Sequence, residues 1–241
     1  AGSTAPTLPD PAPRMPRVDD GPVYELRIYA AAEDRLGHLI KRFREHTDRL
    51  FRKHKMEPVA YWLPTDGTAK EKRRFVYILK HPSRYAAYRN WNAFTHDPEW
   101  KRGVLEKPEF QRLLSERPES IFLTPQDIAS TFPHSTKPSI FELRTTTVTN
   151  GKLPDLQAHH RQHTSRLQLK HGISPRGSWF AYDKPESENT MITLLRHTSR
   201  AQADLNWKAI EAEPDWKKSR GNLNTKTDRL YLKPMDFSPM R

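Results

Sequence analysis

The sequence predicts an α+β fold: two ferredoxin-like βαββαβ units paired sheet to sheet as an intrachain α+β barrel. First, the chain repeats itself: adding 117 to a residue number aligns 23–62 with 140–179 without a gap. A one-residue change in the next loop makes the offset 116, so that Asn90-Trp91 falls on Asn206-Trp207. Second, each copy reads strand, helix, strand, strand, helix, strand. Third, one such sheet leaves a face bare, and the duplicate in the same chain can cover it.

The predicted division has three parts. Residues 1–22 hold six prolines and few large apolar side chains, which favours an extended arm. Residues 23–125 form the first unit and residues 126–241 the second. The start, Ala-Gly-Ser, is what removal of a signal or transit peptide leaves, and equally what a cloning step leaves behind. Two separate, weakly touching domains are the alternative architecture.

The elements of the first unit follow from local patterns. Alternation of β-favouring residues predicts a strand over 23–29, and apolar residues at helical spacing predict a helix over 36–54. Strands over 59–63 and 75–80 follow, joined by a loop that contains the basic run Lys70–Arg74 (KEKRR). Ser83 caps a second helix, Asp97-Pro98 starts a further turn, and a last strand covers 121–123.

The second copy repeats these patterns, beginning with a strand over 140–148. Gly172 suits the left-handed position that ends its first helix, and Lys55 takes that place in the first copy.

Composition excludes several classes of protein. The 241 residues include no cysteine, so there is no disulfide scaffold, thiolate metal site or cysteine nucleophile. No apolar run approaches the ~18 residues that a membrane-spanning helix needs. No glycine-rich nucleotide loop or GxSxG nucleophile motif occurs.

The net charge of +12 is spread over both halves and interleaved with acidic residues. Only the run Lys70–Arg74 concentrates basic residues, and a solvent-exposed loop is sufficient to explain such a run. No helix-turn-helix, zinc or RNP-type signature localises the charge. No nucleic-acid partner is therefore expected.

The sequence resembles the NIPSNAP family of the dimeric α+β barrel superfamily. The strings YELRIY, FREHTDRLFRKHKMEPVAYW and LKHPSRYAAYRNWNAFTHDPEWKR carry the resemblance, and FELRTTT, HHRQHTSRLQLKHGISPRGSW and LLRHTSRAQADLNWKAIEAEPDWKK repeat it. Lys55 stands where a glycine is usual. The resemblance implies the barrel, duplicated domains and a homo-oligomer, but no established activity. It also implies export in a bacterium or a mitochondrial location in a eukaryote.

Glu25 and Arg27 share one face of the first strand, as Glu142 and Arg144 do in the second copy. If the apolar set packs on the helices, these charges face the opposing sheet and form an ionic network across the barrel. Two interpretations stay open: an ion-pair cluster that fixes how the sheets register, and a guanidinium clamp for an anionic ligand.

His46 and His163 lie on the apolar stripe of the first helices, where a histidine can act as a general base or bind haem iron. A core histidine bonded to a strand is the alternative. Trp91 and Trp207 are duplicated with their context, which favours core packing, with ligand stacking as the alternative. The single-copy run 159–163 (HHRQH) is a weak metal candidate, and no metal site is expected.

Two functions remain open. The first is a binding or scaffolding barrel that holds a small apolar or aromatic molecule. The alternative is an oxygenase-like enzyme that acts on such a molecule, with His46 or His163 near the reacting centre. No cofactor is expected for the first, and haem is the alternative for the second.

Overall fold

The computed structural model describes residues 21–128, 139–220 and 223–241. We call 21–128 the first half and 139–241 the second half. The arm predicted over 1–22 lies outside the described residues except for Gly21 and Pro22. So do residues 129–138 of the predicted second unit.

Eight antiparallel strands close into one barrel, in the order β1-β3-β2-β8-β5-β7-β6-β4. The predicted mixed α and β fold with a closed barrel is therefore confirmed. The strands are β1 (Val23–Ala30), β2 (Glu57–Pro64), β3 (Arg74–His81), β4 (Glu119–Ile128), β5 (Ile140–Val148), β6 (Ser174–Ala181), β7 (Thr190–His197) and β8 (Thr225–Pro234).

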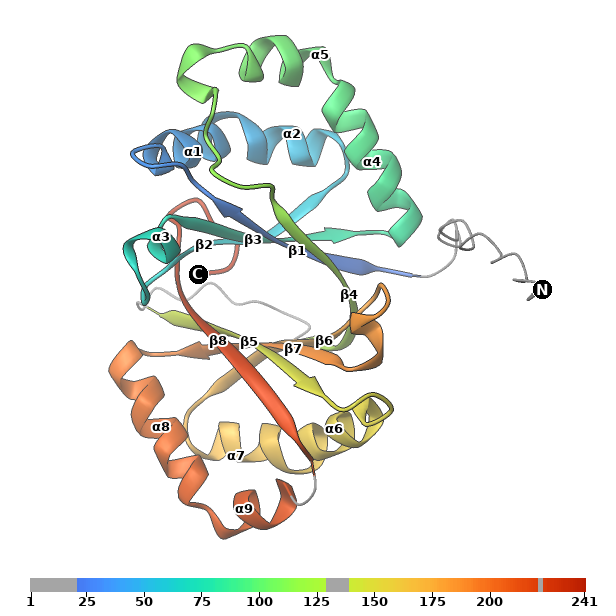
Figure 1. Cartoon of the computed structure of the whole chain (residues 1–241), viewed down its shortest axis with the longest axis vertical. Helices are drawn as coiled ribbons and strands as arrows, with labels where there is room; N and C mark the ends of the chain where they lie inside the picture. The colour runs from blue at the N-terminus through green and yellow to red at the C-terminus, as the bar shows by residue number, and fades with distance from the viewer. Residues whose placement is uncertain (1–20, 129–138, 221–222) are drawn as a thin grey trace, which may run out of the picture.

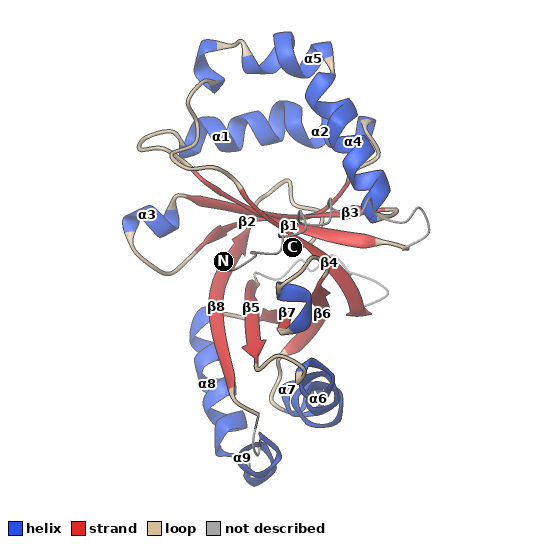
Figure 2. Ribbon diagram, turned by 45° about the vertical axis from the view of Figure 1, so that its right-hand side comes forward, coloured by secondary structure: helices blue, strands red, loops and turns tan. Residues whose placement is uncertain are grey.

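Helices cover the barrel on two opposite outer sides, one set from each half (Figures 1 and 2). In the first half these are α1 (Leu36–Arg42), α2 (Asp48–Lys53), α4 (Arg84–His96) and α5 (Pro98–Trp100), with η2 (Lys101–Leu105) and η3 (Pro108–Phe110) following α5. In the second half they are α6 (Leu153–His159), α7 (Ser165–Lys170), α8 (Arg200–Ala212) and α9 (Pro214–Arg220), and the short η5 (Glu186–Glu188) joins β6 to β7.

A π-helical turn interrupts the first helix of each half. Between α1 and α2 it is η1 (Phe43–Thr47), and between α6 and α7 it is η4 (His160–Thr164). The sequence pattern predicts an uninterrupted helix here. One extra residue in a single turn shifts the apolar stripe only slightly, so the pattern does not reveal the π-helical turn. Such turns occur often at functional sites.

The last strand of each half closes the barrel, because it pairs with the first strand of its own half and with a strand of the other half. β4 begins along β1, where Leu123 lies opposite Tyr24, and then pairs with β6, where Leu123 lies opposite Ala181. Likewise Leu232 of β8 lies opposite Phe141 of β5 and opposite Pro64 of β2. The halves are thus hydrogen-bonded into one sheet.

Two kinds of core result from this closure. The barrel interior is filled by large apolar side chains from both halves, among them Leu26, Trp62 and Trp179. Outside the barrel, each sheet packs against its own helices. In the first half this outer core is strongly aromatic, with Phe43, Phe51, Phe75 and other rings.

The helix ends follow the predicted chemistry. Ser83 Oγ accepts a hydrogen bond from the Ala86 amide, and Ser199 does the same for Gln202. The first helix of each half ends at a left-handed residue, Lys55 at φ +58° and Gly172 at φ +76°.

The basic run is not a plain loop. Thr68 and Glu71 form a capping box that starts the one-turn helix α3 (Ala69–Lys72). Local capping therefore orders the segment that composition alone predicts to be a solvated loop tip. Among the helices that the structure describes, none is long and apolar enough to cross a membrane.

Candidate functional site

A buried glutamate organises a polar cluster in the first half. Arg27 Nη1 donates to Glu25 Oε1 at 2.7 Å, and Trp91 Nε1 of α4 donates to Oε2 at 2.7 Å. His81 Nε2 lies 2.8 Å from Oε2, and Ser120 Oγ donates to Oε1 at 2.8 Å. Both carboxylate oxygens are thus satisfied.

The second half repeats this cluster around Glu142, with one replacement. Arg144 donates to Glu142 at 2.7 Å, Trp207 of α8 donates at 2.7 Å, and His197 Nε2 lies at 2.8 Å. Where the first half has Ser120, the second half has Arg229, whose Nε lies 4.0 Å from Glu142 Oε1. The substitution adds a positive charge to the second cluster.

The predicted ionic network across the barrel is wrong. Glu25 and Arg27 face the helix layer, where Trp91 of α4 meets them, and Tyr24 and Leu26 point into the barrel. The same holds for Glu142 and its partners. The enclosed interior takes the apolar set, whereas the tryptophan and histidine that satisfy the carboxylates lie outside it.

Both carboxylates are held ionised. Burial would raise the pKa of Glu25, but the hydrogen bond from His81 and the charge of Arg27 lower it to about 2. Burial opposes the ionisation of Glu142 in the same way, and His197, Arg144 and Trp207 together lower its pKa to about 2.

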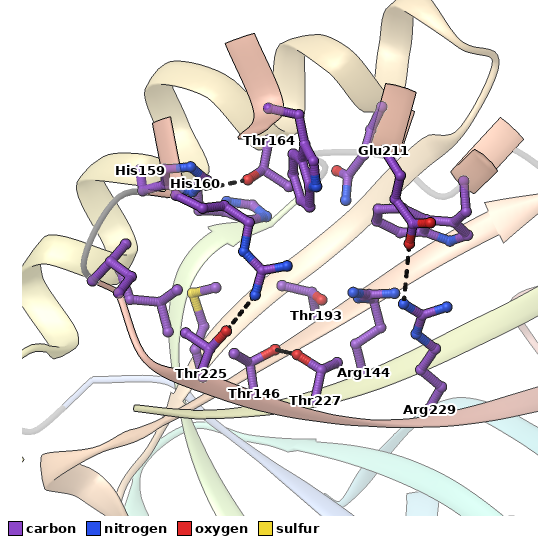
Figure 3. A pocket seen from close by; sticks show the side chains of 17 residues that line it. Arg144, Thr146, His159, His160, Thr164, Thr193, Glu211, Thr225, Thr227 and Arg229 are labelled. Atoms are coloured by element: carbon purple, nitrogen blue, oxygen red, sulfur yellow. Dashed lines mark hydrogen bonds and ion pairs between the residues drawn. The ribbon is translucent and has the colours of Figure 1, made fainter. Parts of the chain in front are cut away.

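A cavity of about 250 Å³ lies between the helices and the sheet of the second half. Figure 3 shows Arg144 and Arg229 on one side of it, and Thr146 and Thr227 side by side on the strands that form its floor. Those two hydroxyls are 3.1 Å apart. Its remaining wall comes from α6, η4, α7, α8 and α9, including Leu156, His159, His160, Thr164, Gln168, Trp207, Glu211, Trp216 and Arg220.

In the first half, aromatic rings occupy the corresponding space. Phe43 and Phe75 have ring centroids 4.4 Å apart, and Tyr77 stacks on Phe51 at 5.8 Å. All four side chains are fully buried or nearly so. With Tyr29 they form five aromatic positions that are smaller or polar in the second half: Tyr29 corresponds to Thr146, Phe43 to His160, Phe51 to Gln168, Phe75 to Met191 and Tyr77 to Thr193.

The cavity is polar and positively charged. Three arginines line it, Arg144, Arg220 and Arg229, against one carboxylate, Glu211. Gln168 is 1% exposed, and its Oε1 has no hydrogen-bond partner among the described residues. A buried, unpaired amide oxygen is costly unless something else bonds to it.

The structure brings six predicted ligand-binding residues into two clusters but places both predicted catalytic histidines elsewhere. His46 lies in η1 against Phe110 and Lys107, and no cavity described here is lined by it. His163 lies in η4 beside His159, at 5.3 Å between ring centroids, and is not among the lining residues of the second-half cavity.

Sequence reasoning missed His159 and His160 as cavity residues. His159 Nε2 lies 2.9 Å from Ser219 Oγ, and its Nδ1 lies 3.3 Å from Thr164 Oγ1. Burial lowers the pKa of His159, and the neighbouring His163 and Arg220 lower it further. The single-copy run 159–163 is the signal in the sequence, but its residue types suggest a weak metal site rather than a cavity lining.

Arg144 and Trp207 line the second-half cavity, and Glu142 anchors them from below. Glu25, Arg27 and Trp91 line a more open hollow of about 320 Å³ in the first half. Arginine stacks on tryptophan in both clusters, at 4.4 Å for Arg27 over Trp91 and 4.0 Å for Arg144 over Trp207.

Among the described residues, no group of three or more His, Asp or Glu side chains is placed to hold a metal ion. Haem does not fit the second-half cavity either. At about 250 Å³ the cavity is smaller than the ~300–1,000 Å³ of typical drug-sized sites, and both ring nitrogens of His159 are already engaged.

Comparison with known proteins gives a family resemblance over part of the chain and a fold for most of it. Residues 24–129 match the NIPSNAP family model. No curated protein matches the chain. A structure from Lactobacillus acidophilus, described as a "putative monooxygenase", is 9% identical, with 89% of this chain and 94% of that chain covered and a TM-score of 0.55.

A similarly described protein of Fusobacterium nucleatum is 6% identical over 91% of this chain and 94% of its own, with a TM-score of 0.56. At such identities these two show the fold alone. A NIPSNAP family protein of unknown function from Agrobacterium tumefaciens is 19% identical over 45% of this chain and 98% of its own, with a TM-score of 0.39. Residues 24–129 are therefore similar to the NIPSNAP family, and the chain as a whole has the fold of the two larger structures.

Proposed function

We propose that the chain is a pair of ferredoxin-like units, 23–125 and 126–241, in which the second unit binds a small molecule and the first is structural. The strand order supports the two units: β4-β1-β3-β2 in the first half and β8-β5-β7-β6 in the second. The matching registers of β4 and β8 support the pairing of the units within one chain.

One observation carries the binding function. The two halves share the same sheet, helices and buried glutamate cluster, yet only one of these two helix–sheet spaces is filled by five aromatic side chains. A packed interior normally leaves few voids larger than a water molecule. A cavity of about 250 Å³ lined by histidines, arginines and threonines is therefore best explained as a site for a ligand.

Grafting first-half residues into the second half tests this function. Thr193→Tyr places the equivalent of Tyr77 in the cavity, and Gln168→Phe places the equivalent of Phe51 there. We expect either variant to weaken binding of single-ring fragments (benzoate, benzamide, benzyl alcohol and phenol) at least about tenfold. Saturation-transfer NMR on the full chain measures the change in fragment affinity.

Thr149→Tyr is the matched control, because Thr149 is exposed and lies outside the cavity lining. It should bind the fragments as the original chain does. Equal binding by the control and by both grafted variants would contradict a ligand site in this cavity. Two grafts are used so that one poorly folded variant does not decide the result.

An oxygenase activity and a homo-oligomer are two further proposals. The descriptions of the two monooxygenase-like structures fit an oxygenase without favouring it, and oxygen uptake with a bound fragment tests it. Because each half covers the other's sheet, a second copy of the chain is not needed to close the barrel. Light scattering of the purified chain tests the oligomer.

A further inference from the structure

The second-half cavity has two arginines directly opposite each other on neighbouring strands. Arg144 of β5 pairs in register with Arg229 of β8, whereas in the first half Arg27 of β1 pairs with Ser120 of β4. Like charges at such positions repel each other. Figure 3 shows both guanidinium groups at the same side of the cavity.

The surrounding carboxylates only partly neutralise this pair. Glu142 is engaged at 2.7 Å by Arg144, so that Arg229 stays 4.0 Å from it. The other carboxylate near Arg229 is Glu211, at 3.9 Å. Both of these distances exceed that of a charge-assisted hydrogen bond, ~2.8 Å. Arg229 is therefore available to a further anionic group.

The rest of the cavity suits an organic molecule rather than a bare ion. Leu156, Met191 and Leu223 are apolar lining residues, and the rings of Trp207 and Trp216 also line it. A cavity of ~150 Å³ already holds benzene, so that about 250 Å³ accommodates one ring with one or two substituents. The unpaired Oε1 of Gln168 can accept a hydrogen bond from such a substituent.

We infer that the second-half cavity selects a small organic anion of the carboxylate class, bound by Arg144 and Arg229, that also carries a hydroxyl group for Gln168. This inference rests on the proposed function, because it names the ligand class of the same cavity. The first half has Ser120 where the second has Arg229, and aromatic rings fill the space that corresponds to this cavity, so the selectivity is expected of the second half.

Titration of the full chain with benzoate, benzamide and inorganic phosphate tests the charge. We expect benzoate to bind at least about tenfold more tightly than its neutral isostere benzamide. Arg229→Ser, which introduces the first-half residue, should remove that preference. Lys226→Ser is the matched control: it removes one positive charge from the same strand at an exposed residue outside the cavity lining.

The outcomes separate the inference from the proposed function. Equal binding of benzoate and benzamide that both grafted variants abolish would overturn anion selectivity and leave the ligand site standing. Phosphate binding without benzoate binding would overturn the organic class. No binding of benzoate, phosphate or any fragment would overturn both proposals.

A comparison of hydroxybenzoates with benzoate tests the proposed hydroxyl group of the ligand. Among the three isomers of hydroxybenzoate, at least one should bind more tightly than benzoate, and Gln168→Met should remove that gain relative to its own affinity for benzoate. An unchanged gain in Gln168→Met would overturn the role of Gln168.

Discussion

A single glutamate in each half determines how the polar side chains beneath the helices are arranged. Glu25 and Glu142 each fix an arginine, a histidine and a tryptophan from three different elements. A buried carboxylate without such partners would be very costly. The clusters therefore stabilise the packing of helix on sheet, and in the second half the same arginine also faces the cavity.

Glu142→Gln should destabilise the chain by about 3 kcal/mol at neutral pH, because Arg144 loses its buried counter-charge. The lowered pKa of Glu142 also sets a pH window. A carboxyl with a folded pKa of about 2, below its ordinary value of 4.5, contributes stability above pH 4.5 that is lost as the pH falls towards 2.

Urea unfolding at pH 7 and at pH 3 measures both effects. The original chain should lose more stability between these pH values than Glu142→Gln does. Glu33→Gln, at an exposed residue, is the control and should follow the original chain. An identical pH dependence of all three would show that Glu142 contributes no linked stability.

At the scale of elements, the first helix of each half differs from a regular helix in its middle and at its end. Its π-helical turn, η1 or η4, lies where the helix passes over the sheet, and η4 contributes His160 and Thr164 to the cavity. Both helices then end in the left-handed conformation, on Lys55 in one half and on Gly172 in the other. Only glycine adopts this conformation without steric cost.

Lys55→Gly should therefore stabilise the chain by about 0.5–1 kcal/mol, the left-handed penalty of lysine less the greater freedom that glycine gains on unfolding. Gly172→Lys is the reciprocal variant and should destabilise it. A Cβ at Gly172 would meet Asn206 at 3.6 Å, an ordinary contact, so the cost lies in the backbone. Urea unfolding measures both, and a Lys55→Gly variant no more stable than the original would contradict the account.

At the scale of the whole molecule, the two seams β2–β8 and β4–β6 join the halves into one barrel. Leu63 lies opposite Lys233 at the first seam, and Thr124 lies opposite Phe180 at the second. The C-terminal residues reinforce the first seam. Ser238 Oγ accepts a hydrogen bond from the Tyr61 amide at 2.9 Å, and Met240 reaches the barrel interior.

A disulfide across the first seam tests the closure. Opposite residues of antiparallel strands lie at Cα separations of ~4.5–5.5 Å, within the range of a disulfide. We expect Leu63→Cys with Lys233→Cys to cross-link within the chain and to stabilise it by about 3 kcal/mol. The chain has no other cysteine to compete.

Thiol titration and denaturing gel mobility measure the cross-link. Lys233→Cys alone is the control and should keep one reactive thiol. Two thiols that stay free under oxidising conditions, or that link separate chains, would show that β2 and β8 are not paired as described.

The sequence by itself determined the elements and their correspondence between the halves. Alternation located β1 and β5, the serine at 83 located a helix start, and the left-handed positions at 55 and 172 located the helix ends. These features depend on residues close together in the chain. Alternation also showed correctly that Glu25 and Arg27 share a face.

Only the tertiary structure decided which face that is, because a period of two sorts side chains into two sets and does not say which set is enclosed. The cavity was likewise out of reach of local patterns. It exists because five aromatic positions of the first half, on β1, η1, α2 and β3, are smaller or polar in the second. Their volumes combine only when the helix lies on the sheet, and that packing lines the cavity with His159, His160 and Gln168 rather than with His163.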